Sequence, residues 1–219
     1  KGLGNAQKES LLIQQFQDII GDPDVDVELI SPYFVPTEAG VEAFAWLVRK
    51  GVEVKVLTNS LASTDVAAVH AGYAKRRKAL LKAGGVLYEM QRHPTQVKRM
   101  KRKKRFLGSS GSSLHAKTFS VDRKHVFVGS FNFDPRSANL NTELGFVIDS
   151  PRLAQRINQA FYDEIPAHAY EVKLTETGRI YGIEQRDAGV QTYTSEPNSS
   201  VWRRVSTRLL SWLPIEGLL

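Results

Sequence analysis

Two short segments with the character of β-strands, joined by a tight turn, constrain the fold of this chain more than any other feature. Residues 115–121 alternate between polar and apolar side chains, which predicts a β-strand. Residues 122–124 predict a turn that begins with Asp, a common turn residue, and residues 126–128 predict the next strand. Side chains two residues apart on a strand share a face, so we expect His115 and Lys117 side by side, about 7 Å apart along the strand.

These segments carry a long and specific pattern of residues, H-x-K-x4-D-x6-G-S-x-N. Its polar members are His115, Lys117, Asp122, Ser130 and Asn132. Near neutral pH an imidazole can attack phosphorus or, when charged, protonate a leaving oxygen. The lysine can neutralise phosphoryl oxygens, and the serine hydroxyl and asparagine amide can donate hydrogen bonds to them. The pattern predicts phosphoryl transfer, and we expect the site to use neither a metal nor another cofactor.

Three acids near the pattern have roles that the sequence leaves open. Glu143, which precedes an expected strand over 144–148, is the candidate to hold the second ring nitrogen of the histidine. Asp122 can take part in catalysis, or it can cap the turn and brace the strands. Asp134 can pair with Arg136 across their own loop, or contact the substrate.

Three residues outside the pattern are candidates for binding the phosphate or the substrate. Tyr33, Asn59 and His70 lie at or just beyond the expected ends of strands, where α/β folds place their sites. His70 falls on an expected helix. It either contacts the substrate or is a structural histidine whose ring is hydrogen-bonded within the protein.

The remaining elements alternate between helix and strand, which predicts an α/β sandwich. We expect Thr37 to cap the second helix. Helices are expected over 8–20, 37–50, 65–82, 150–164 and 199–213, and further strands over 25–33, 52–58, 86–90, 170–175 and 179–185.

With these residues in place, the chain resembles the phospholipase D superfamily, and its order of segments resembles the C-terminal half of bacterial cardiolipin synthases of the C-type branch. The resemblance covers nearly the whole chain and is most specific at the His-Lys-Asp pattern. It is carried beyond that pattern by S-P-Y-F-V-P at 31–36, L-T-N-S at 57–60, the segment 70–84, Y-E at 88–89 and the tail over 202–216.

The resemblance implies a phospholipase D-like α-β-α sandwich that forms one half of a pseudo-twofold pair. Residues 1–185 would form the C-terminal catalytic domain, and residues 186–219 a polar linker and an amphipathic helix. The implied reaction makes cardiolipin from phosphatidylglycerol and a second phospholipid through a phosphohistidine. His115 would be the nucleophile or the general acid and base, with the N-terminal half of the same enzyme or a homodimer mate supplying the second histidine.

A second function class stays open. In the nuclease branch of the superfamily each chain has one such pattern, and a homodimer completes the phosphodiesterase site. The basic run would then hold a nucleic acid backbone. In a third alternative, this half is inactive alone and only binds its partner half.

Charge and hydropathy point to an anionic surface. The formal net charge is +7, and residues 98–105 hold seven basic side chains and no acid. This run lies in a loop over 92–113 that could attract anionic substrates or an anionic membrane, or simply be solvated. In the tail, Trp202, Val205, Leu209 and Trp212 recur at helical spacing, either to enter a lipid interface or to dock on the protein's own core.

Several classes are excluded or disfavoured. No run of eighteen apolar residues is present, so nothing in this sequence predicts a membrane span. We see no signal peptide, and the start at Lys1 suggests a piece of a longer protein. There are no cysteines and no H-E-x-x-H pattern, so no thiolate or zincin metal site is expected. We expect a peripheral protein of the bacterial inner membrane, on its cytoplasmic face.

Overall fold

The computed structural model describes residues 5–92, 114–186 and 189–212, and the basic run over 98–105 lies outside them. The helices are α1 (Asn5–Ile20), α2 (Thr37–Lys50), α3 (Ala67–Lys82), α4 (Pro135–Asn139), α5 (Pro151–Asp163), α6 (Ile165–His168) and α7 (Val201–Leu210). The strands are β1 (Asp26–Ile30), β2 (Glu53–Asn59), β3 (Val86–Met90), β4 (Thr118–Val121), β5 (His125–Gly129), β6 (Gly145–Asp149), β7 (Ala169–Leu174), β8 (Ile180–Arg186) and β9 (Gly189–Tyr193).

The described strands form one sheet in the order β6-β5-β4-β1-β2-β3-β7-β8-β9. The central strands β1, β2 and β3 are parallel and are connected by helices, as parallel pairing requires. β4 pairs antiparallel with β1, with Leu29 opposite Phe119, and the hairpin β4–β5 continues into β6. The predicted α/β sandwich is therefore confirmed, with mixed rather than purely parallel pairing.

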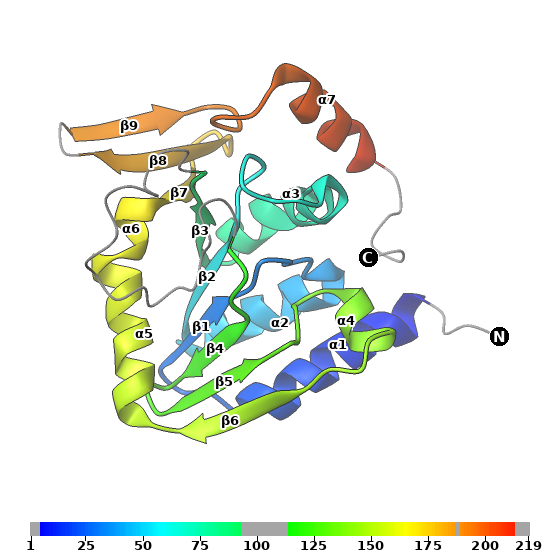
Figure 1. Ribbon diagram of the computed structural model, residues 1–219, viewed down its shortest axis with the longest axis vertical. Coiled ribbons are helices and arrows are strands. Elements are labelled where there is room, and N and C mark those ends of the chain that lie inside the picture. The colour runs from blue at the N-terminus through cyan, green and yellow to red at the C-terminus, as the bar shows by residue number, and fades with distance from the viewer. Residues whose placement is uncertain (1–4, 93–113, 187–188, 213–219) are drawn as a thin grey trace.

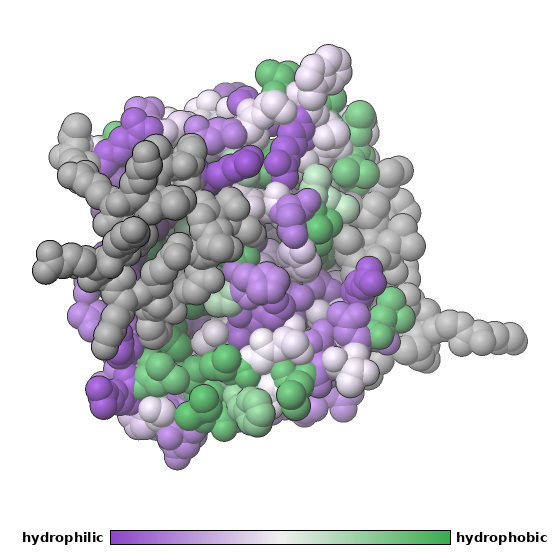
Figure 2. All heavy atoms as spheres, viewed as in Figure 1, coloured by the Kyte–Doolittle hydropathy of each residue, from purple (hydrophilic) through white to green (hydrophobic). Residues whose placement is uncertain are grey.

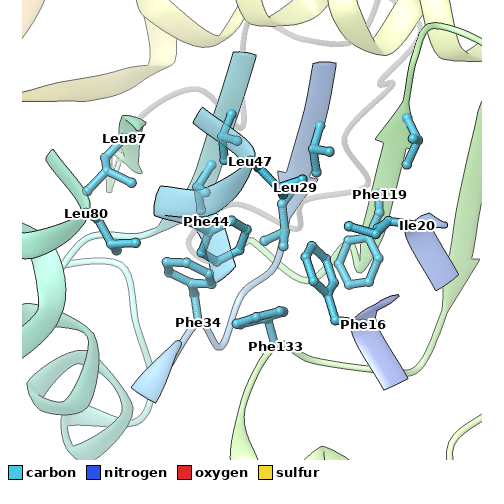
Figure 3. Close-up of a cluster of buried hydrophobic side chains, with 14 of the residues drawn as sticks. Phe16, Ile20, Leu29, Phe34, Phe44, Leu47, Leu80, Leu87, Phe119 and Phe133 are labelled. Carbon is cyan, nitrogen blue, oxygen red and sulfur yellow. The ribbon is translucent and has the colours of Figure 1, made fainter. Parts of the chain in front are cut away.

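Helices cover both faces of the sheet (Figure 1). On one face, α1, α2 and α3 bury a cluster of aromatic and aliphatic side chains against β1, β2 and β4 (Figure 3). Within it the Phe16 ring meets the Phe133 ring edge-on, with centroids 4.8 Å apart. On the other face, α5 and α6 pack Ile157 and Phe161 against the sheet. Because Phe133 belongs to the G-S-x-N loop, this core also anchors that loop.

Most expected elements are present, with differences at their ends. Ser150 caps α5 by accepting a hydrogen bond from the Leu153 N–H, as the Ser-Pro pair predicts. The expected capping role of Thr37 is wrong: the residue is buried, has a φ of 53° and makes no capping bond to α2. Residues 189–193, expected within a polar linker, form β9 because their backbone pairs with β8.

The apolar stripe of the tail helix faces outward, so it does not dock on the protein's own core. Thr207 of α7 is buried, whereas Trp202 is 84% exposed and Leu209 is 56% exposed. The polar face of α7 therefore packs against α3, and its apolar stripe faces outward. Within the described ranges, no helix is both long and apolar enough to cross a membrane.

Candidate active site

Three neighbouring strands bring Lys117 and Ser130 of the pattern, together with Glu143, to one end of the sheet. Lys117 precedes β4, Ser130 follows β5, and Glu143 lies two residues before β6. The Gly129 N–H donates to the Lys117 carbonyl at 3.2 Å, and the Ser130 N–H donates to the Leu144 carbonyl at 2.8 Å. The antiparallel ladder thus fixes three chemically active residues beside one another although they span 27 positions of sequence.

Ser130 and Glu143 are joined directly. The Ser130 hydroxyl donates a short hydrogen bond to the Glu143 carboxylate and accepts one from the Leu144 N–H at 3.0 Å. The Asn141 amide donates to the other carboxylate oxygen at 3.1 Å. Among the described contacts Glu143 is therefore bound to Ser130 and Asn141, and not to the His115 ring that it was expected to orient.

Lys117 is half-buried and lies in the field of two carboxylates. Burial lowers the pKa of its ammonium, and the negative charges of Glu143 and then Asp134 act in the opposite direction. The ammonium donates to the His115 carbonyl at 3.4 Å. A cation held at this point can neutralise a phosphoryl oxygen with little rearrangement.

His115 is exposed and lies just before β4 rather than inside it, since the strand begins at Thr118. Its position is set by its neighbour. Leu114 is fully buried, and its N–H and carbonyl both bond to the Asn59 side chain, at 3.0 and 3.3 Å. The Asn59 amide also donates to the Pro32 carbonyl at 3.3 Å. Asn59, expected to bind phosphate, is thus used to hold the backbone next to His115.

The G-S-x-N loop is fastened to the loop that carries Tyr33. The Val35 N–H donates to the Phe133 carbonyl at 2.7 Å, and the Phe133 N–H donates to the Ser31 hydroxyl at 3.2 Å. Asn132, in this loop, has a buried side-chain oxygen without a hydrogen-bond partner among the described residues. These bonds hold the loop that carries Tyr33 against the G-S-x-N loop, at the edge of the candidate site.

Asp134 connects these loops electrostatically. It caps α4 by accepting from the Ser137 N–H at 2.8 Å, and no ion pair with the Arg136 side chain is found among the described contacts. Burial raises the pKa of Asp134 to about 6. The Tyr33 hydroxyl donates to Asp65 at 3.0 Å, and burial, followed by Asp65 and Asp134, raises the Tyr33 pKa to about 12. Sequence reasoning missed Asp65, which no pattern marks.

A pair of glycines gives β5 and β6 their close approach at the site. Gly129 lies opposite Gly145 in the ladder. A Cβ at Gly145 would meet the Phe127 ring at 2.1 Å, and one at Gly129 would meet the Leu144 carbonyl at 2.5 Å. Neither glycine has positive φ, so packing rather than backbone conformation requires them.

Asp122 lies at the opposite end of β4 from His115. Its carboxylate accepts from the backbone N–H groups of Asp24, Val25 and Asp26, at 3.0, 2.7 and 3.3 Å. These bonds tie the β4–β5 turn to the beginning of β1. Every described contact of this side chain thus fits the alternative in which Asp122 caps the turn and braces the strands.

His70 lies apart from the other candidates. It is buried in α3, with Nε2 3.5 Å from a Glu196 oxygen, and its ring meets Tyr73 edge-on. Arg77 donates to the same Glu196. The structure thus places His70 in a buried ionic cluster under α7 rather than beside Lys117. Among the described residues no three His, Cys, Asp or Glu side chains converge to form a metal site.

A comparison with family models matches residues 17–165 to the cardiolipin synthase, phospholipase D-like domain. The chain belongs to this family. It is 50% identical to cardiolipin synthase C of Escherichia coli over all of its own length, which is 46% of that relative. The chain thus spans about half the length of this curated relative.

Two solved structures share the fold. Nuc of Salmonella typhimurium, a phospholipase D family member, superimposes with a TM-score of 0.52 at 19% identity, over 75% of this chain and 89% of its own. The phosphatidylserine synthase of Haemophilus influenzae gives a TM-score of 0.53 at 16% identity, over 74% of this chain and 37% of its own. At such identities the likeness establishes the fold alone, and it confirms the expected phospholipase D-like sandwich.

Proposed function

We propose that this chain is one catalytic half of a phosphatidyl transferase that makes cardiolipin. The observation that carries the proposal is the meeting of Lys117, Ser130 and Glu143 at adjoining strand ends, with His115 exposed beside them. The match of the whole chain to about half of a cardiolipin synthase supports the reaction class. We propose phosphatidylglycerol and a second phospholipid as the substrates.

The proposed reaction has two displacements at one phosphorus. In the first, a neutral imidazole nitrogen attacks the phosphodiester, and the bond from phosphorus to the leaving alcohol breaks. The other histidine, as an imidazolium, protonates that alcohol and becomes neutral. In the second, this neutral imidazole takes the proton of the acceptor alcohol, whose oxygen attacks phosphorus and breaks the bond from phosphorus to nitrogen. Phosphatidylglycerol is the acceptor, so the product is cardiolipin. His115 supplies one of the two imidazoles.

The other residues of the site stabilise charge and position groups. The Lys117 ammonium lies where it can neutralise the phosphoryl oxygens, and Ser130 and Asn132 can donate to them. When phosphate takes the Ser130 hydroxyl as a donor, Glu143 loses that partner and becomes available to the His115 ring. Asn59 and Asp122 position the backbone: Asn59 holds the segment that leads into β4, and Asp122 holds the turn that follows β4.

A second half must bring the second imidazole, and β6 offers the surface for it. Val128 of β5 and Phe146 of β6 lie opposite each other in the ladder and are 41% and 64% exposed. Leu144 and Ile148 extend the same face of β6 and are also exposed. Figure 2 shows hydrophobic side chains gathered over this edge. The patch adjoins Ser130 and Glu143, so a half docked here would be close to the reacting phosphate.

The outward stripe of α7 supports attachment to a membrane surface, where the substrates lie. Trp202, Val205, Leu209 and Trp212 are exposed on the described structure, so the alternative in which they dock on the core does not apply. A short helix with tryptophans on one face and arginines beside it is typical of a lipid interface. This stripe supports peripheral attachment to a bilayer, and we propose the cytoplasmic face of the bacterial inner membrane as its location.

Formation of cardiolipin by purified protein tests the function. The reaction is measured in phosphatidylglycerol vesicles with the chain alone and with a longer polypeptide that contains it and the second half. We expect turnover only where two histidine patterns are present, and His115→Ala should abolish it. His125→Ala is the matched control, because this exposed histidine lies at the far end of β5.

Wild-type turnover by the His115→Ala protein would contradict the proposal. Cleavage of single-stranded DNA by a homodimer of the chain, without phosphatidyl transfer, would establish the nuclease alternative in its place. A chelator should leave turnover unchanged, since the proposed chemistry uses imidazole and ammonium groups alone.

A further inference from the structure

A cavity lies away from the His-Lys-Asp pattern, between α3, α7 and the β7–β8–β9 end of the sheet. It has a volume of about 370 Å³, and no residue of the pattern lines it. α7 packs against α3 (Figure 1), and its residues Arg204, Thr207 and Arg208 line the cavity. A volume of this size is in the range of small-ligand pockets and would accommodate a phosphorylated glycerol.

The floor of this cavity is a buried ionic cluster. The Arg77 guanidinium donates to Glu89 at 2.8 Å and to Glu196 at 2.5 Å. Burial opposes the charge of Glu196, but Arg77 and then His70 more than offset it and hold the pKa of that carboxyl well below its usual range. Both carboxylates are thereby committed to cationic partners within the floor.

The rim, in contrast, is basic. It holds Lys75 of α3 and Arg204 and Arg208 of α7. The Arg204 guanidinium bonds only neutral oxygens among its described contacts, including the Ser199 carbonyl at 2.8 Å and the Ser195 hydroxyl at 3.2 Å. Arg208 is exposed and has no carboxylate partner among the described residues. The four basic and two acidic side chains that line the cavity leave an excess of two positive charges.

We propose that this cavity is a second binding site for a phosphate-bearing group, the head of an anionic phospholipid or a free glycerophosphate. Arginines in such a pocket can bind phosphate oxygens through two N–H donors each, and the lysine adds a point charge. Tyr181 at the lining supplies a hydroxyl for the alcohol part of the ligand.

The site is connected to the catalytic end through one loop. Leu61 lines the cavity and lies two residues after Asn59, the last residue of β2, which holds Leu114 beside His115. The Arg203 guanidinium of α7 donates to the Thr64 carbonyl at 2.5 Å and fastens the helix to this loop. An occupied cavity would therefore stabilise the loop that directly follows Asn59, the residue that positions the backbone beside His115.

Direct binding tests the proposal without relying on turnover. The 219-residue chain with Lys117→Ala, which weakens the catalytic phosphate site, is titrated in a calorimeter with glycerol 1-phosphate and with monomeric dihexanoyl phosphatidylglycerol. We expect Lys75→Gln and Arg208→Gln each to weaken binding by about tenfold. Lys124→Gln and Arg152→Gln, which remove charges at the opposite end of the sheet and on α5, should leave it unchanged.

An occluding variant separates this cavity from general electrostatics. Ala74→Phe places a ring at the lining without changing the charge, and it should abolish binding while circular dichroism and the unfolding midpoint stay near those of the parent. Equal affinities of both ligands indicate a site for free glycerophosphate, and tighter lipid binding indicates a headgroup site. Equal affinity in Ala74→Phe and its parent, or no binding of either ligand at about 10 mM, would overturn the proposal.

Discussion

The Ser130 hydroxyl donates to the Glu143 carboxylate across the ends of β5 and β6. In the proposed reaction phosphate displaces this carboxylate from Ser130, and Glu143 then holds the His115 ring. We expect Glu143→Gln to lower turnover by about a hundredfold, in the range for positioned acid–base groups, and Ser130→Ala by about tenfold. The double variant should lose less than the product of the two, because both residues act in one network. Turnover in the assembled enzyme measures this, and strictly multiplicative losses would show that the two residues act independently.

Asn59 is expected to matter for stability and for catalysis together. Its buried side chain accepts from the Leu114 N–H and donates to the Leu114 carbonyl. Asn59→Ala should therefore lower the free energy of unfolding by about 2 to 3 kcal/mol, as expected when buried polar groups lose their partners. Turnover should fall as well, because His115 loses its fixed position. Urea unfolding gives the first quantity. Gln159→Ala, an exposed amide bonded only to Asp163 in its described contacts, should change it by less than about 0.5 kcal/mol.

Asp122 should affect stability alone. Asp122→Ala removes the acceptor for three backbone N–H groups and should cost about 2 kcal/mol of unfolding free energy, typical for bonds to a charged group. Asp122→Asn should cost less, because it keeps an acceptor and tolerates the φ of 53° at this position. Turnover per folded molecule should stay near the parent value in both. A loss of turnover in Asp122→Asn without a loss of stability would instead place this residue in catalysis.

Stability should depend on pH through Glu28. This carboxyl is fully buried, and burial raises its pKa to about 7, from 4.5. Since the folded-state pKa is the higher one, the contribution of the carboxyl is complete below about pH 4.5 and is lost as the pH rises through 7. Glu28→Gln should therefore be more stable than the parent at pH 8 by about 1 to 3 kcal/mol and nearly equal to it at pH 5. Urea unfolding at both values checks this, and an equal difference at the two pH values would contradict it.

Binding to vesicles should depend on the outer face of α7. Trp202→Ser with Leu209→Ser should weaken co-sedimentation with anionic vesicles by about tenfold or more, because interfacial helices bind through buried apolar area. Trp46→Ser is the matched control, since this tryptophan of α2 is 50% exposed on another surface. High salt should weaken the remaining binding if the nearby arginines contribute, at about 1 kcal/mol each. An equal loss in the Trp46→Ser protein would show that α7 is not the binding surface.

Much of the fold could be predicted because its signals are local. Alternation predicted β4, the short apolar run over 126–128 predicted β5, and the Ser-Pro pair predicted the beginning of α5. β9 was missed because its polar side chains are mostly exposed and only pairing with β8 defines it. The outward face of α7 was undecided for a related reason: helical spacing reveals a stripe but not what covers it.

The site could be predicted as a set of residues but not as a set of contacts. Spacing placed Lys117 and Ser130 together, since both depend on one hairpin. The bond between Ser130 and Glu143, and that between Asn59 and Leu114, join segments far apart in sequence, and no local pattern encodes them. The role of His70 stayed open because a histidine in a helix reveals its partner only once Glu196 has been brought to it.

The glycine of the G-S-x-N segment has a consequence for how variants of this protein would be interpreted. Gly129 and its opposite, Gly145, leave room for the Phe127 ring, and Gly145 lies outside the pattern altogether. A methyl group at Gly145 would force β5 and β6 apart next to Ser130. Such a variant would be scored as inactive in a genetic screen although every reacting atom is intact. Loss of activity on substitution of Gly145 would therefore indicate a steric clash with the Phe127 ring and not the loss of a catalytic group.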